Sequence, residues 1–226
     1  MLLQSVLADC IFLYVFLRSV FQMKNKNLIF LAEAAIMIAA STVLSLFKLW
    51  EAPLGGSITL ASVLPLAVIG YRHGILKGLG TAFVASVLQL MLGLQNLSYG
   101  TTWYAVLAIL LFDYLVAFTC YGVTGIFSKA GKGRISNTVS FTAGFALASI
   151  LRFACHFITG AVVWHSLTRV WYADDPTHIV HIYGPWMYSF IYNIGYMLPD
   201  MLIAAGVGIA LSLVLDFKKQ NLIYKK

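Results

Sequence analysis

The sequence predicts an all-α membrane protein, a bundle of six transmembrane helices preceded by an additional apolar segment. Three observations lead to this prediction. First, 61% of the 226 residues are hydrophobic and only 10% are charged, which leaves too little polar surface for a soluble domain of this length. Second, the apolar residues form runs of roughly twenty, the length that a helix needs to cross a bilayer. Third, basic residues gather in every second loop between these runs.

The N-terminal segment, residues 1–23, is apolar but is interrupted by Asp9 and Arg18. It lacks the positively charged start and the small-residue cleavage site of a signal peptide. We therefore expect an accessory element, either an extra span or a helix lying in the headgroup region. Residues 24–226 are expected to form a single membrane domain.

Six apolar runs in this domain are candidate spans. They cover residues 28–47, 58–71, 75–94, 103–127, 137–164 and 186–215. The second run is short for a bilayer of roughly 30 Å, so we expect it to begin as irregular chain. The loop before it contains aromatic and turn-forming residues: Trp50, Glu51, Pro53, Gly55 and Gly56.

The loops between the runs alternate in charge. Those on one side carry eleven basic residues: Lys24, Lys26, Arg72, Lys77, Lys129, Lys132, Arg134, Lys218, Lys219, Lys225 and Lys226. Those on the other side carry only Lys48 and Arg169. Because cytoplasmic loops are enriched in Lys and Arg, we expect the N- and C-terminal ends of the six-helix core to lie in the cytoplasm. The net charge of +7 has the same origin and does not indicate a nucleic-acid partner.

In the fifth run, four notable residues are spaced by four positions. They are a cation, an imidazole, a glycine and an indole: Arg152, His156, Gly160 and Trp164. Residues spaced by four lie along one slowly rotating face of a helix. A cation and an imidazole are costly to expose to lipid, and in membrane helices they normally face the bundle interior or a ligand cavity. We therefore expect this face to line a binding site.

One acid, Asp113, lies deep in the fourth run. An unpaired carboxylate there is costly, so we expect it to have a cationic or hydrogen-bonding partner. Two readings remain open. Asp113 faces a ligand, or it forms an ion pair with Arg152 that only fixes the register of two helices.

The sixth run begins with a row of tyrosines, Tyr188, Tyr192 and Tyr196, which packing or an interfacial aromatic belt would explain equally well. Asn193 is different, because its amide needs partners and must bind another helix or a ligand. Together, the runs offer one acid, an imidazole, an amide, a phenol and several aromatic faces. This set suits a small, flat, polar cation.

Other chemistries have no matching motif. The chain has no Gly-x-Ser-x-Gly and no His-Glu-x-x-His sequence, which argues against hydrolysis. Residues 125–133 are rich in glycine but lack the spacing and the Ser/Thr of a phosphate loop. Asp174, Asp175 and His178 lie close in sequence without a rigid ligand spacing, so we expect a hydrated loop and no metal.

The first run has small residues on one face: Ala32, Ala35 and Ala39. Such faces let another helix approach closely. The partner is either a helix of the same bundle or another protein.

Four segments resemble, in order and spacing, the ThiT family of thiamine-specific substrate-binding subunits (S-components) of energy-coupling factor transporters. They are residues 33–39, 111–114, 152–164 and 188–193. The resemblance extends from about residue 28 to residue 215. It implies a six-helix subunit of the bacterial cell membrane, without enzymatic activity or cofactor. Such a subunit binds thiamine from outside and docks on an EcfT-like transmembrane coupling protein with two ATPase subunits.

The resemblance also implies roles for single residues. It assigns substrate binding to eight positions: Asp113, Tyr114, Arg152, His156, Gly160, Trp164, Tyr188 and Asn193. It assigns contact with the coupling protein to Ala35 and Ala39. We expect Trp164 to stack on a ring of the ligand, Asp113 to complement the thiazolium charge, and Gly160 to leave room for the ligand.

One departure from the family concerns the first outer loop, where some relatives carry an aromatic residue and this chain has Gly56. Trp50 is close by in the sequence, and this lid contact is expected to be absent or shifted.

Three alternatives remain. The ligand is another small vitamin or a pyrimidine precursor; or the chain is an intramembrane enzyme that uses Asp113 and His156 as an acid–base pair; or it is a structural protein in which Asp113 and Arg152 merely pair.

Overall fold

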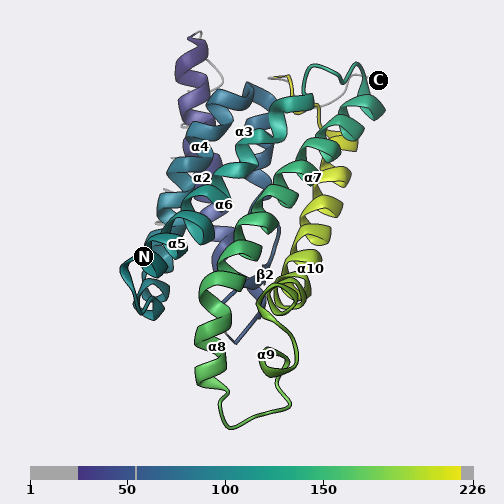
Figure 1. The fold of residues 1–226 in the computed structure, drawn as a ribbon. Coiled ribbons are helices and arrows are strands. Elements are labelled where there is room, and N and C mark those ends of the chain that lie inside the picture. The colour runs from purple at the N-terminus through teal and green to yellow at the C-terminus, as the bar shows by residue number, and fades with distance from the viewer. Residues whose placement is uncertain (1–24, 54, 220–226) are drawn as a thin grey trace, which may run out of the picture.

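The computed structural model describes residues 25–53 and 55–219, which form an elongated bundle of helices (Figure 1). Within these described ranges, five helical stretches are long and apolar enough to cross a membrane: Lys26–Leu46, Ile75–Leu92, Trp103–Phe127, Arg134–Trp171 and Pro185–Val214. The prediction of a helical membrane bundle is thereby confirmed. The accessory segment predicted for residues 1–23 lies outside the described part of the chain.

The second predicted span differs from expectation. Helix α2 (Lys26–Leu46) is followed by an antiparallel hairpin of β1 (Lys48–Glu51) and β2 (Ser57–Thr59). Only then does α3 (Leu64–His73) begin, with ten residues. At about 1.5 Å per residue, this helix reaches only halfway across a bilayer of about 30 Å. The predicted span of residues 58–71 is therefore half strand and turn, and half helix.

Helix α3 is the centre of the core. Its residues 64–71 carry no charged side chain and are all buried, and only the last turn is basic, with Arg72 and His73. The elements packed around it include α4 (Ile75–Leu92), η3 (Cys120–Phe127) and α7 (Arg134–Thr159). Glycines let these backbones touch: a Cβ on Gly78 would lie 2.7 Å from the carbonyl oxygen of Gly122 and would also meet Gly70. Small residues at such crossings permit tight packing between membrane helices.

The other elements belong to three long helices and to the loops between helices. They are η1 (Leu94–Tyr99), α5 (Trp103–Ala108), η2 (Ile109–Leu115), α6 (Val116–Thr119), η4 (Gly160–Trp164), α8 (His165–Trp171), α9 (Ile179–Ile182) and α10 (Pro185–Val214). Two of them, η2 and η4, are π-helical turns inside the fourth and fifth predicted spans. Such turns are rare and occur frequently at functional sites.

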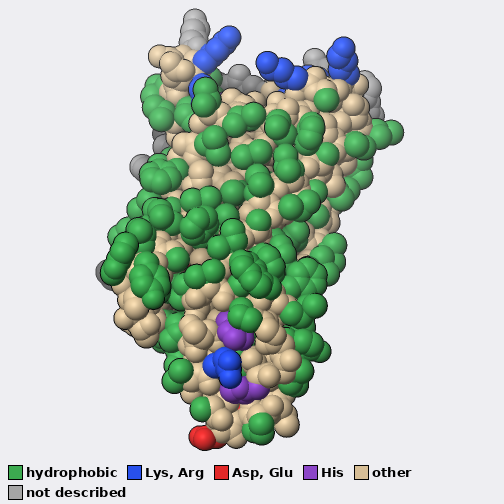
Figure 2. All heavy atoms as spheres, in the orientation of Figure 1, with side chains coloured by type: hydrophobic (Ala, Val, Ile, Leu, Met, Phe, Trp, Pro, Cys, Tyr) green, Lys and Arg blue, Asp and Glu red, His purple; other side chains and the backbone are tan. Residues whose placement is uncertain are grey.

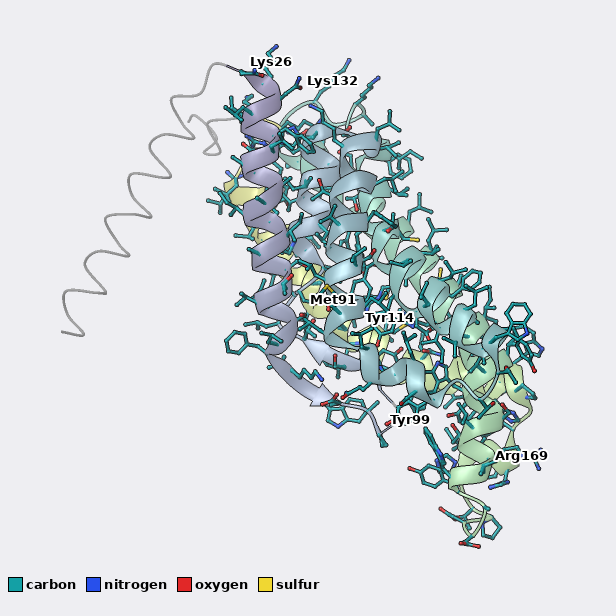
Figure 3. The ribbon with its side chains drawn as sticks, turned by 90° about the vertical axis from the view of Figure 1, so that its left-hand side faces the viewer. Lys26, Met91, Tyr99, Tyr114, Lys132 and Arg169 are labelled. Atoms are coloured by element: carbon teal, nitrogen blue, oxygen red, sulfur yellow. The ribbon has the colours of Figure 1, made fainter. Side chains whose placement is uncertain are left out.

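The two ends of the bundle differ in charge. Lys26 and Lys132 lie at one end and Arg169 at the other (Figure 3). On the face shown in Figure 2, Lys and Arg side chains gather at the first end, and hydrophobic side chains cover the surface between the ends. This separation agrees with the expected orientation, in which the basic end faces the cytoplasm. The orientation itself stays a prediction.

Candidate ligand-binding site

A cavity of about 680 Å³ lies between the hairpin and the helices that surround it. The eight residues to which the sequence analysis assigned substrate binding all line it: Asp113, Tyr114, Arg152, His156, Gly160, Trp164, Tyr188 and Asn193. Tyr114 and Tyr99, which also lines the cavity, mark its position between the middle of the bundle and the Arg169 end in Figure 3. The fold thus brings together all eight positions, and their roles in binding stay predictions.

Asp113 is the centre of a hydrogen-bond cluster at the cavity wall. Its Oδ1 accepts a hydrogen bond from Thr159 Oγ1 and lies 3.1 Å from His156 Nδ1. Its Oδ2 accepts from Trp164 Nε1 at 2.8 Å. These bonds offset the cost of burying a carboxylate that is only 8% exposed. A carboxylate offers about four acceptor positions, so one remains for a ligand.

The π-helical turns explain how these side chains meet. Asp113 lies in η2, and Trp164 is the last residue of η4. A π turn contains more residues than an α turn, so it counteracts the drift of residues that are spaced by four. Trp164 is therefore turned back toward the side of the helix that carries His156. Both reach the same carboxylate as a result.

Two buried polar atoms in the cavity wall lack a hydrogen-bond partner within the described ranges: His156 Nε2 and Arg152 Nε. An unsatisfied buried donor or acceptor is costly, and native structures contain few of them. If His156 donates from Nδ1 to Asp113, its Nε2 is an acceptor in the neutral ring. The polar edge of a bound ligand would satisfy both atoms.

Arg152 does not pair with Asp113, which corrects one of the two readings of these residues. Its Nη1 donates instead to Asp200 Oδ2 at 3.3 Å, and its guanidinium lies 4.7 Å from the ring centre of Phe118. Asp200 Oδ1 accepts from both the backbone N–H and the hydroxyl of Thr59, each at 2.8 Å. Asp200 was not among the predicted site residues, although an acid within the sixth apolar run is the same signal that singled out Asp113.

Gly160 lines the cavity, but its lack of a side chain makes room for helix α10 and not, as expected, for a ligand. A Cβ at this position would collide with Ser189 Oγ and would lie 2.9 Å from Asn193 Nδ2. The space beside Gly160 is therefore filled by α10 and does not hold a ligand. The glycine lets α10 approach the π-helical turn closely enough to close this wall.

Tyr188 and Asn193 join the helices that form this wall. The hydroxyl of Tyr188 lies 2.9 Å from Thr168 Oγ1. Asn193 Nδ2 donates to the carbonyl oxygen of His156 at 3.2 Å, and its Oδ1 accepts from Tyr196 at 2.8 Å. The amide thus binds another helix, one of the two outcomes expected for it.

On the opposite wall, the hydroxyl of Tyr114 accepts from Asn96 Nδ2 at 2.7 Å and donates to Gly93 at 3.1 Å. These bonds hold η1 over the cavity. Tyr99 of η1 in turn packs edge-on against Trp164, with ring centres 6.0 Å apart. Asn96 and Tyr99 had no signal in the sequence, because both lie in a short loop helix without periodicity.

Among the described residues of the loop between α2 and α3, no aromatic side chain lines the cavity. Trp50 is 50% exposed and is not among the residues that line the cavity. Gly56 lines it with a φ of +94°, and a Cβ there would lie 2.7 Å from the ring of Tyr196. Both the backbone conformation and the close approach require glycine at this position. Trp50 therefore does not reach the cavity, and a tyrosine of α10 packs beside the loop.

These features define the class of the protein: a multi-pass membrane protein with a ligand-sized cavity inside its helical bundle. The sequence matches the family described as thiamine transporter protein (Thia_YuaJ) over residues 31–220. The chain belongs to this family, and it is a transporter component and not an enzyme.

Individual relatives agree with this assignment. The thiamine transporter ThiT of Bacillus subtilis (strain 168) is 33% identical over 190 residues, which cover 80% of this chain and 89% of that protein. ThiT of Lacticaseibacillus paracasei is 26% identical over 178 residues, with coverage of 76% and 81%. The solved structure of ThiT from Listeria monocytogenes has a TM-score of 0.64 at 21% identity, covering 83% of this chain and 95% of that one. This last similarity supports the fold.

Proposed function

We propose that this chain is the thiamine-binding, substrate-capturing subunit of an ATP-driven vitamin importer. Thiamine carries a permanent positive charge on its thiazolium ring and an aminopyrimidine as its second ring. The observation that supports thiamine best is the Asp113 carboxylate, which is buried, held by three side chains and still has an acceptor position beside the cavity. The family and its named relatives point to the same ligand.

The surrounding residues fit the two rings. The N–H of Trp164 is already bound to Asp113, which fixes the indole and leaves its face for stacking. Within the described residues, His156 Nε2 has no partner and can accept a hydrogen bond from the polar edge of the aminopyrimidine, and the N–H of Arg152 Nε can donate one. Tyr188 and Asn193 act mainly by holding α10 in place, because their polar atoms are already paired.

The energy for transport would come from partner proteins. We propose that the first span docks on an EcfT-like coupling protein with two ATPase subunits, through the face that carries Ala35 and Ala39. Both alanines are exposed on α2, and neither lines the cavity. Small exposed residues four apart allow a partner helix to approach the backbone.

A titration of the purified full chain with thiamine tests the proposal. Trp164 and Trp171 line the cavity, so thiamine should quench the intrinsic tryptophan fluorescence at micromolar concentrations. An absence of quenching together with an absence of heat in calorimetry would contradict it. A response to a pyrimidine precursor alone would identify a different ligand for the same cavity.

A further inference from the structure

The formal charges that line the cavity cancel one another. Lys48 and Glu51 form an ion pair of 2.6 Å on the hairpin, with both side chains about half exposed. Farther inside, Asp113 and Arg152 are both buried and contribute one charge of each sign. With His156 counted as neutral, the formal charges of this lining sum to zero. By itself, it would give a cation no advantage over a neutral molecule.

Asp200, which lies outside the cavity lining, adds a negative charge to this sum. It is 2% exposed and is not among the residues that line the cavity. It accepts a hydrogen bond from Arg152 at 3.3 Å and two from Thr59 at 2.8 Å. The positive charge of Arg152 is therefore already compensated inside the protein. The negative charge of Asp113 is then not compensated by Arg152 and is available to a cationic ligand.

We propose that Asp200 is a positioning and specificity-determining residue. By neutralising Arg152, it leaves the buried part of the site with one net negative charge, which selects a monocation over an uncharged molecule of the same shape. This inference depends on the proposed function, since thiamine is the monocation that the site would select. Without Asp200, the unpaired guanidinium of Arg152 would repel the thiazolium ring.

Asp200 also has a mechanical role that can be separated from its charge. It is the last of three residues, spaced by four on α10, that hold the hairpin. Tyr192 donates to the carbonyl oxygen of Gly55 at 3.0 Å, and the ring of Tyr196 lies against Gly56. Loss of a hydrogen bond in this row would loosen the hairpin for every ligand alike. Loss of the charge would affect cations only.

The test compares thiamine with deazathiamine, its uncharged isostere, on the purified full chain in lipid nanodiscs. The quantity measured is the charge selectivity, the Kd for deazathiamine divided by the Kd for thiamine. We expect Asp200→Asn to lower the selectivity by about tenfold or more. Adding Arg152→Gln to Asp200→Asn removes the unpaired cation and should restore the selectivity to within about threefold of wild type. Equal losses for both ligands in Asp200→Asn, or no restoration in the double variant, would overturn the proposal.

Two further variants keep the test decisive. Asp200→Glu retains the charge while it displaces the hydrogen bonds, so its selectivity should stay close to that of wild type even if both affinities fall; a tenfold drop would count against the proposal. Asp216→Asn removes another buried acid, which pairs with Lys219 at 3.2 Å outside the cavity, and should leave the selectivity unchanged. If wild type binds neither ligand, the proposed function fails; if it binds thiamine and Asp200→Asn does so equally well, only the role of Asp200 fails.

Discussion

Trp164 Nε1 donates to Asp113 Oδ2 at 2.8 Å, which joins two π-helical turns from different membrane helices. This bond fixes the orientation of an indole and of a carboxylate at the same time. Because both side chains line the cavity, the bond presents an aromatic face and a negative charge at a defined separation. Such preorganisation lowers the entropic cost of binding a flat cation.

Replacing Trp164 by Phe keeps an aromatic face and removes the N–H donor. Hydrogen bonds to charged groups contribute about 1.5–3 kcal/mol, so we expect thiamine affinity to fall roughly 10- to 100-fold. Trp164→Leu also removes the ring face and should weaken binding further. Calorimetric titration measures both, and an unchanged affinity in Trp164→Phe would show that the bond to Asp113 does not support binding.

Asp113→Asn removes the charge and nearly preserves the shape. Thiamine affinity should fall about a hundredfold or more, while the affinity for deazathiamine should fall about tenfold or less, because only thiamine loses a buried charge partner. Asp113→Glu is the matched control that retains the charge. Equal losses for the two ligands in Asp113→Asn would rule out charge complementation.

Gly160→Ala tests the close approach of α10 to the fifth span. The added methyl group meets Ser189 Oγ, and overpacking of this kind costs about 1–3 kcal/mol. We expect a lower melting temperature and weaker thiamine binding. Gly195→Ala is the control, since a Cβ there meets nothing within 4 Å and should leave the melting temperature equal or higher. Equal melting temperatures of Gly160→Ala and wild type would show that this wall is loosely packed.

Ala35→Trp should separate capture from transport. The exposed indole would keep a partner helix away from α2, while the cavity lies elsewhere and should bind thiamine as in wild type. Co-purification with the coupling protein and uptake of labelled thiamine into cells should both be lost. Val84→Trp places the same side chain on an exposed position of α4 and serves as the control. Normal uptake in Ala35→Trp would exclude this face as the docking site.

We expect the turn at residues 175–178, between α8 and α9, to depend on pH. Hydrogen bonds from the side chain and the backbone of Thr177, at 2.6 and 3.0 Å, hold the pKa of Asp175 below its ordinary value of 3.8. A depressed pKa means that the turn is stabilised above the ordinary value and loses this support as the pH falls through the lower one. Hydrogen exchange at residues 175–178 should therefore accelerate, after correction for intrinsic rates, only below about pH 4. Thr177→Val should remove this dependence.

Most of the helical bundle and eight residues of the cavity lining could be predicted from the sequence. Arg152, His156 and Trp164 are spaced by multiples of four residues, which places them on one face of a helix. Exposing the charge of Arg152 or Asp113 to lipid costs so much free energy that each must face the interior of the bundle. These signals are local. For this reason they located the side chains that share the cavity without knowledge of the tertiary contacts.

The parts that could not be predicted depend on contacts between distant segments. The contacts of Asp200 depend on the fold, because it accepts hydrogen bonds from Thr59, which lies 141 positions away in the chain, and from Arg152 of another helix. The hairpin has short strands that periodicity does not distinguish from a loop, and the π-helical turns have no local sequence pattern. The purpose of Gly160 depends on Ser189 of another helix, so spacing within one helix could not reveal it.

The ten-residue length of α3 has a consequence for the architecture of the site. Thr59 and Ser62, just before the helix begins, already line the cavity. At this position in the bundle, helix α3 therefore occupies only half of the membrane thickness, and the hairpin of β1 and β2 covers the space beyond its N-terminus. The short length of this one segment leaves room for an internal chamber, while the neighbouring helices are long enough to cross the membrane.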